Sequence, residues 1–229
     1  MLKTYEEVID WLKVNKIDNY TILKDLTVNV DNDVDISDKL LLEIPVKFGV
    51  VSGDFNCSGN KLKDLIGSPI NVLGSFGCSS NQLSSLLGCP ETVGGAFDCS
   101  SNNLTNLIGG PKLVGSFYSC RSNKIVDLIG CPNVINSDFG CEYNKLSSLS
   151  NCPESVGGSF LCENNLFNFI DILPKNVTGK FFYSENPLKN FKSGLTFEEL
   201  KIQVSNRLLQ EELLVGLPLK LKLNQPKKL

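Results

Sequence analysis

A 21-residue repeat constrains this chain more than any other feature of its sequence. Asparagine returns at a constant spacing, with a cysteine three residues before it and an aromatic residue two positions before the cysteine. The asparagines are Asn60, Asn81, Asn102, Asn123, Asn144, Asn165 and Asn186; the cysteines are Cys57, Cys78, Cys99, Cys120, Cys141 and Cys162, with Tyr183 in the last unit; the aromatic residues are Phe55, Phe76, Phe97, Tyr118, Phe139, Phe160 and Phe181. Seven units in unbroken register predict an array in which each unit stacks on its neighbours.

Each unit begins with a short strand and a turn. In the stretch GAFDCSSNNLTNLIGGPKLV, residues 95–114, Phe97 and Cys99 are two positions apart, so both side chains point to one face of a strand. Asn102 follows where the chain must turn. Its amide can donate and accept, and we expect it to satisfy main-chain groups of its own and neighbouring coils.

The second half of each unit returns the chain to its starting edge. Leu104 and Leu107 form an apolar pair on a segment too short for a full helix, and Pro111 with its flanking glycines fixes the return turn. A valine or isoleucine, here Val114, ends the unit. Stacked units would place their strands in a parallel sheet with about 4.8 Å between neighbours, about 30 Å across for seven strands.

The pattern Phe97-x-Cys99-x-x-Asn102-x-Leu104-x-x-Leu107 resembles the leucine-rich repeat. The first leucine of that repeat is mostly absent, and Gly94, Gly115 and Gly157 occupy its position. The short unit is similar to the repeats of bacterial effector proteins. Its GGSF-x-C motif is similar to that of repeat proteins of bacteria and their large phages. The resemblance covers residues 51–191. It implies an α/β solenoid: a right-handed, leucine-rich-repeat-like superhelix with a parallel sheet on one face and helical caps at both ends.

The two ends of the chain depart from the repeat, and we expect them to form caps. Residues 1–50 are predicted to hold a helix over 4–15, opened by a Thr4/Glu7 capping box, with Tyr5, Val8, Ile9 and Leu12 on its apolar face. Strands at Val28, Val30, Val34 and Ile36 would lead into a degenerate first coil, with Lys39 in place of asparagine. The seven repeats occupy 51–191. Residues 192–229 are predicted to hold a second helix and a basic tail; Thr196 and Glu199 open the helix, Phe197, Leu200, Val204 and Leu208 form its apolar face, and it stops near Gly216.

The composition argues against chemistry. The chain has no histidine, which excludes Ser/His/Asp and Cys/His catalytic arrangements. The nine cysteines suggest a metal or redox site, but six lie in the inward position of the repeat and none forms a C-x-x-C pair, so we interpret them as core residues. We therefore expect no enzyme, no metal, no cofactor and no small-molecule substrate. The reduced cysteines, the absence of a signal peptide and the absence of a long apolar run predict a cytoplasmic protein without membrane attachment.

Core packing determines which residues occupy the inward positions of the strands. Residues that recognise a partner are therefore expected at the outward positions. In residues 54–103 these positions hold mostly small polar side chains. Further along they change to Phe117, Arg121, Asp138, Glu142, Tyr143, Leu161, Glu163, Asn164 and Phe182, which we predict to bind a partner. An alternative for Leu161, Leu166 and Phe182 is that the C-terminal helix covers them.

Three functions are compatible with this pattern. We favour a non-catalytic protein-protein interaction module, for instance a phage or bacterial factor that inhibits or recruits a host protein. The alternative is a structural or self-assembling component of a virion or surface assembly, in which the array is a spacer; homo-oligomerisation is left open. Nucleic-acid binding through the lysines of the tail, 217–229, is the weakest interpretation, because the strand positions carry no basic stripe and the net charge is −3.

Overall fold

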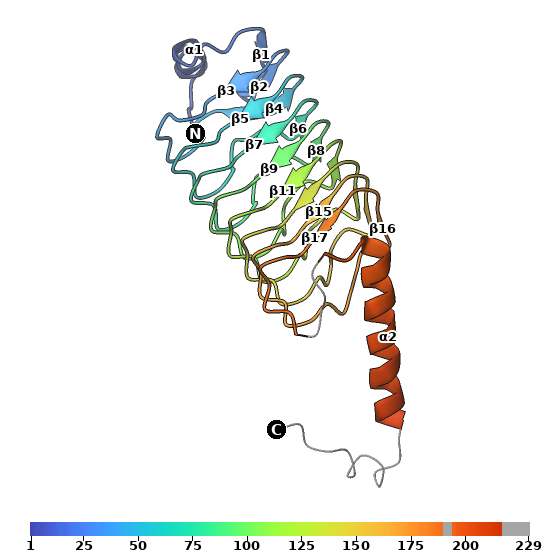
Figure 1. Ribbon diagram of the computed structural model, residues 1–229. Helices are drawn as coiled ribbons and strands as arrows, with labels where there is room; N and C mark the ends of the chain where they lie inside the picture. Colours follow the sequence, from blue (N-terminus) through green and yellow to red (C-terminus); the bar gives the residue numbers. More distant parts are fainter. Residues whose placement is uncertain (190–193, 217–229) are drawn as a thin grey trace.

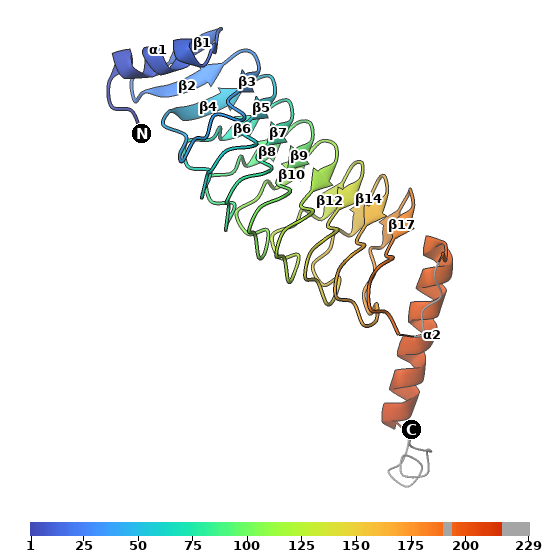
Figure 2. The same ribbon diagram turned by 60° about the vertical axis from the view of Figure 1, so that its left-hand side comes forward.

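The chain folds into a β-solenoid of about seven turns, each built from one 21-residue unit. The computed structural model describes residues 1–189 and 194–216. Figure 1 shows the coils stacked into an elongated body, with helix α1 (Tyr5–Val14) at the N-terminal end and helix α2 (Phe197–Gly216) at the C-terminal end. Figure 2, turned by 60°, shows the same stack from another side. The predicted tail, 217–229, lies outside the described residues.

One long parallel sheet contains the aromatic and cysteine-bearing strands. From the N-terminal to the C-terminal end of the solenoid, its eight strands are β3 (Val34–Asp35), β5 (Phe55–Asn56), β7 (Phe76–Gly77), β9 (Phe97–Asp98), β11 (Tyr118–Ser119), β13 (Phe139–Gly140), β15 (Phe160–Leu161) and β17 (Phe181–Phe182). Neighbouring strands pair in register at the 21-residue spacing, so that Phe76 lies beside Phe97 and Phe97 beside Tyr118.

A second wall of the solenoid is also made of strands. A six-stranded sheet contains β1 (Tyr20–Ile22), β2 (Thr27–Val30), β4 (Lys47–Val51), β6 (Asn71–Val72), β8 (Thr92–Val93) and β10 (Leu113–Val114); a three-stranded sheet contains β12 (Val134–Ile135), β14 (Ser155–Val156) and β16 (Asn176–Val177). The β1–β2 pair is antiparallel and the other pairs are parallel. The valine or isoleucine that ends each unit points inward from these strands.

The predicted α/β leucine-rich-repeat superhelix, with a sheet on one face only, is therefore wrong. The described chain has helices only at its two ends, and strands on two sides of every central coil. The reason lies in the length of the unit. The strand, the asparagine turn and the Gly-Pro turn use most of the 21 residues. The remaining Leu-x-x-Leu segment is too short to form a stable helix. The residues after each proline instead form a short strand, which pairs with the equivalent strand of the neighbouring coil.

The core is a continuous column of apolar side chains. The aromatic residues of successive coils stack, with ring centroids 5.5 Å apart for Phe55 and Phe76 and 5.9 Å for Phe76 and Phe97. The column reaches Trp11 of α1 through Phe48 at one end, and Phe197 of α2 through Phe181 at the other. The six repeat cysteines are fully buried beside it, and all nine cysteines are free. Their predicted place in the core is confirmed.

The repeat asparagines connect the coils as predicted. The Oδ1 atom of Asn81 accepts from the backbone N–H of Leu62 in the preceding coil at 3.0 Å. Its Nδ2 atom donates to the carbonyls of Cys57 in the preceding coil and Cys78 and Ser79 in its own. In the first coil, where Lys39 replaces asparagine, Asn60 of the next coil accepts from the N–H groups of Lys39 and Leu41. Each buried amide thus satisfies main-chain groups that a turn would otherwise leave unpaired.

Both predicted terminal helices are confirmed, together with their capping boxes. The Thr4 hydroxyl accepts from Glu7 N–H and the Glu7 carboxylate accepts from Thr4 N–H; Thr196 and Glu199 exchange the same two bonds. Val8 and Leu12 of α1 are buried, as are Phe197, Leu200 and Val204 of α2. Tyr5 and Leu208, predicted on the apolar faces, are instead exposed. No helix in the described ranges is both long and apolar enough to cross a bilayer.

Candidate functional site

The predicted partner-binding residues lie together on the outward side of the eight-stranded sheet, around β11, β13, β15 and β17. We call them the strand-face patch: Phe117, Arg121, Asp138, Glu142, Tyr143, Leu161, Glu163, Asn164 and Phe182. The in-register pairing brings equivalent positions side by side, so that Leu161 of β15 lies opposite Phe182 of β17. Backbone bonds from Ser122 N–H to Glu142 and from Tyr143 N–H to Glu163 join the turns that carry the remaining residues.

The aromatic and arginine residues of the strand-face patch are accessible. The Phe117 side chain is 41% exposed and the Tyr143 side chain is 53% exposed. The guanidinium carbon of Arg121 lies 5.9 Å from the centroid of the Tyr143 ring, which is the range of a cation–π contact. The three side chains therefore present two rings and a positive charge to solvent.

Tyr143 occupies an unfavourable backbone position. It lies in the left-handed region, with φ of 55°, at the residue before the repeat asparagine. The equivalent residues in the other coils are Asp38, Gly59, Ser80, Ser101, Ser122, Asn164 and Glu185, all small or polar. A bulky side chain rarely adopts this conformation, and it is found most often where function requires the residue. The tyrosine is not required by the turn itself, because glycine and asparagine fill the same position elsewhere.

Two glutamates stack beside the arginine. Glu142 and Glu163 stand at equivalent positions of neighbouring coils, and the Oε2 atom of each is buried without a hydrogen-bond partner among the described residues. Burial raises the pKa of Glu142, and the charge of the Glu163 carboxylate raises it further. The backbone amide of Glu142 and the Arg121 guanidinium act in the opposite direction. Gly140 lies directly under the Glu142 carboxylate and leaves room for it. The pair concentrates negative charge that one neighbouring arginine balances only in part.

Two members of the strand-face patch have structural tasks. The Asp138 carboxylate accepts from the backbone N–H of Ser159 at 2.6 Å, as Asp54 does from Ser75 N–H in an earlier coil. Asn164 adopts a left-handed turn conformation, and its backbone N–H donates to the carbonyl of Ser184 at 3.2 Å. Both residues connect neighbouring coils, and the Asp138 carboxylate is therefore less available to a partner than the side chains of Arg121 and Tyr143.

Helix α2 does not cover the C-terminal part of the patch. Phe182 remains 38% exposed, Leu166 remains 51% exposed and Leu161 is half-buried. The helix instead closes the open end of the core, where Phe197 stacks on Phe181 with ring centroids 5.3 Å apart. The alternative in which α2 buries these three residues is therefore wrong for Leu166 and Phe182.

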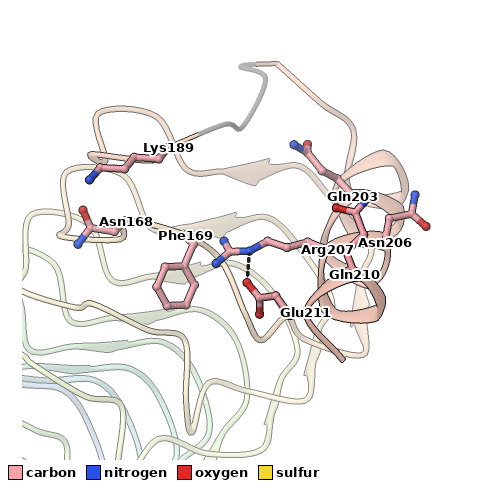
Figure 3. A pocket seen from close by; sticks show the side chains of 8 residues that line it. All are labelled: Asn168, Phe169, Lys189, Gln203, Asn206, Arg207, Gln210 and Glu211. Atoms are coloured by element: carbon pink, nitrogen blue, oxygen red, sulfur yellow. Dashed lines mark hydrogen bonds and ion pairs between the residues drawn. The ribbon is translucent and has the colours of Figure 1, made fainter. Parts of the chain in front are cut away.

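A groove of about 710 Å³, which the residue pattern does not predict, lies between α2 and the last coils (Figure 3). It is lined by Asn168, Phe169, Lys189, Gln203, Asn206, Arg207, Gln210 and Glu211. The Arg207 guanidinium covers the Phe169 ring at 4.4 Å and bonds Glu211 at 3.0 Å. Phe169 stands where other coils have Asp, Ser or Asn, so its departure from the repeat is explained by the docking of α2.

A second surface was also missed. In four coils, an apolar residue comes directly after the second member of the apolar pair and points outward at one corner of the solenoid. These residues are Ile66, Leu87, Ile108 and Ile129. The signal is present in the sequence as a third apolar residue at the 21-residue period. Its orientation is not, because the segment has neither helical nor strand periodicity.

Residues 1–189 and 194–216 contain no cluster of three or more His, Cys, Asp or Glu side chains arranged to hold a metal ion. Burial raises the pKa of the Cys57 thiol to about 12 and raises the pKa values of the other repeat cysteines as well. Thiols of this kind are protonated at neutral pH and are poor nucleophiles and metal ligands.

Fold and surface together define a capped β-solenoid repeat protein. Comparisons with protein-family models, with curated proteins and with solved structures found no match to this chain. No family match therefore identifies the repeats as leucine-rich repeats, and the 21-residue coil geometry is the basis for the class.

Proposed function

We propose that this protein is a non-catalytic interaction module that binds a protein partner through the strand-face patch. The observation that carries the proposal is the exposed Phe117, Arg121 and Tyr143 group on a sheet whose earlier coils present mostly small polar side chains. Aromatic residues and arginine contribute most of the binding energy in protein interfaces, and Tyr143 is kept in spite of its backbone conformation.

The charges of the patch favour a partner with a basic group. Glu142 and Glu163 stand one coil apart, with a single arginine beside them. A lysine or arginine of the partner placed over this pair would offset the repulsion between the carboxylates, while its apolar neighbours contact Phe117 and Tyr143. Leu161 and Phe182 extend the apolar contact along the sheet.

The setting we propose is the cytoplasm, which is consistent with nine free cysteines. Because the repeat motif resembles those of bacterial and phage repeat proteins, we propose that this protein inhibits or recruits a host protein. The structural or self-assembling role is kept as the alternative, to be separated from partner binding by experiment.

The test is an affinity capture from cytoplasmic lysate, read by quantitative mass spectrometry. Wild type is compared with a Phe117→Ser, Arg121→Ala, Tyr143→Ala variant. The control is Tyr5→Ala, Lys13→Ala, Val14→Ser on α1, which removes one aromatic, one cationic and one aliphatic exposed side chain, where the patch variant removes two aromatic and one cationic. Circular dichroism establishes that all three proteins are folded.

A protein retained by wild type and control, and lost from the patch variant by about tenfold or more, is the expected result. Binding of the purified candidate is then measured against Glu142→Gln, Glu163→Gln, which we expect to weaken it. Equal capture by all three proteins contradicts the proposal and moves the structural alternative to the front.

A further inference from the structure

Four apolar side chains form a straight row along one corner of the solenoid. We call this row the corner ladder: Ile66, Leu87, Ile108 and Ile129, which are 49%, 61%, 58% and 44% exposed. The residues immediately before them, Leu65, Leu86, Leu107 and Leu128, are fully buried and fill the core. The corner ladder is therefore not needed to complete the interior, and an aligned apolar row of this kind indicates a contact surface.

The backbone of the corner ladder is held in place. The N–H groups of Ile66, Ile108 and Ile129 donate to the side chains of Asp64, Asn106 and Asp127, two residues earlier, at 2.8–3.1 Å. A glycine with positive φ follows each ladder residue, as Gly88 (φ 86°) follows Leu87. A surface fixed in this way loses little conformational entropy when it binds.

The corner ladder has a defined end toward the C-terminus. In the next two coils its position is taken by Ser150 and Asp171, both half-buried. Ile70 and Glu91 line the same hollow as Ile66 and Leu87, so they form one flank of the row. Lys112 stands one coil beyond Glu91, with 3.6 Å between its Nζ and the Glu91 carboxylate, and both side chains are mostly exposed.

We propose that the corner ladder binds a second copy of this chain in an antiparallel, two-fold arrangement. Its rungs are separated by the spacing of parallel strands, about 4.8 Å, and span about 14 Å. A second solenoid of the same kind presents side chains at the same spacing and can match the row rung by rung. A two-fold axis between the coils of Leu87 and Ile108 places Leu87 against Ile108 of the second copy, and Ile66 against Ile129 of the second copy.

The charges on the flank favour the antiparallel direction. With this axis, Glu91 faces Lys112 of the second copy and Lys112 faces Glu91 of the second copy, so that two ion pairs form by symmetry. A parallel arrangement would set this flank against the opposite flank, near Asp64 and Asp127, and would lose both pairs. The flank is thus self-complementary in one direction only.

This interface is separate from the strand-face patch. The corner ladder follows the Leu-x-x-Leu segment of each coil, whereas the patch lies on the eight-stranded sheet. The inference does not depend on the proposed partner binding, and a dimer leaves the patch residues accessible.

The first test is sedimentation equilibrium of the full chain between about 1 and 200 µM. We expect a reversible dimer. Ile108→Lys places an unpaired charge in the contact and should raise the dimer Kd by about 30-fold or more. Val14→Lys, a matched change at an exposed valine of α1, should leave the Kd unchanged. A monomer throughout this range, or equal Kd values for wild type and Ile108→Lys, would overturn the proposal.

Charge reversal tests the direction. Glu91→Lys alone should raise the Kd by about fivefold, and Glu91→Lys combined with Lys112→Glu should restore it. Oxidative cross-linking provides an independent reading: Leu87→Cys chains mixed with Ile108→Cys chains should give the mixed disulfide dimer. A Leu87→Cys homodimer as the main product would contradict the antiparallel arrangement.

Discussion

The inward positions of the solenoid repeat the same residue types in nearly every coil, whereas the outward positions change along its length. Inside, the same residue types recur because each aromatic ring stacks on its equivalent one coil away and each asparagine bonds the main chain of the preceding coil. Outside, small polar side chains of the early coils give way to the strand-face patch, and the corner ladder ends at Ser150. In this fold, the recurring inward residues therefore serve stability, and the exposed outward positions are the candidates for recognition. The predictions below test this division, from the largest expected effect on stability to the smallest.

The largest effect is expected at high pH. Burial raises the pKa values of the six repeat thiols above their ordinary value of 9.0, to about 12 for Cys57. The unfolded chain ionises near pH 9 while the folded chain does not, so the contribution of each thiol is fully present below pH 9 and is lost above it. The loss is about 1.4 kcal/mol per thiol for each pH unit until the folded pKa is reached.

The prediction is checked by urea unfolding at pH 7, 9 and 10. The unfolding free energy should be highest at pH 7, about 2–3 kcal/mol lower at pH 9, where half of the thiols of the unfolded chain are ionised, and mostly gone within one to two units above. A Cys99→Ala, Cys120→Ala variant should show a shallower decline. An unchanged midpoint at pH 10 would mean that the thiols are not sealed from water.

The next largest effect is expected for one repeat asparagine. Asn102 accepts from Leu83 N–H and donates to the carbonyls of Cys78, Cys99 and Ser100. Asn102→Ala leaves these buried groups unpaired and should cost about 3–5 kcal/mol of unfolding free energy. Asn186→Ala, in the partly exposed last coil, should cost less than half as much. Equal losses in urea titrations of the two variants would contradict the inward–outward comparison.

A smaller effect is expected where one coil departs from the inner pattern. Tyr118 replaces phenylalanine, its buried hydroxyl has no hydrogen-bond partner among the described residues, and it points toward Gly110. Other coils have serine, cysteine or leucine at the position of Gly110. Tyr118→Phe should stabilise the protein by about 1 kcal/mol, because it removes an unpaired polar group.

The effects of substitutions at Tyr118 and Gly110 on the unfolding free energy should also be coupled. Gly110→Cys should destabilise the wild type by about 1–3 kcal/mol and cost much less in the Tyr118→Phe background, because the hydroxyl occupies the space that the cysteine needs. A double-mutant cycle from thermal or urea unfolding measures this coupling. Additive effects would show that the glycine is not a response to the tyrosine.

The smallest effect is expected at the surface. Tyr143 has φ of 55°, and Gly59 occupies the equivalent position in an earlier coil. Tyr143→Gly should leave the unfolding free energy unchanged or raise it by up to about 1 kcal/mol, since glycine adopts this conformation without strain. The same variant should weaken binding of the captured partner. A clear loss of stability would indicate that the tyrosine serves the fold.

Much of this architecture could be read from residue spacing. The roles of Cys99 and Asn102, the column of aromatic residues and both capping boxes follow from local chemistry repeated at a fixed period. The placement of Phe117 and Arg121 on an accessible face follows from strand alternation, and that of Tyr143 follows from its position in the turn before the repeat asparagine. These inferences succeed because each depends on a residue and its immediate neighbours in the coil.

The second sheet and the corner ladder could not be predicted in this way. A strand of two residues, such as Thr92–Val93, has no alternation to detect and becomes a strand only when the next coil supplies its partner. The course of the chain between Leu104 and Pro111 has no helical or strand period, so the sequence does not tell whether Leu107 or Ile108 turns inward.

The sequence by itself determined the repeat, the identity of the core and the two caps, because the same contacts recur every 21 residues. Only the tertiary structure decided that the coil has two strand walls, that α2 closes the core end without covering Phe182, and that Ile66, Leu87, Ile108 and Ile129 align at one corner. The physical reason is that these features arise from stacking. A coil has no inside or outside until its neighbours bury one of its sides.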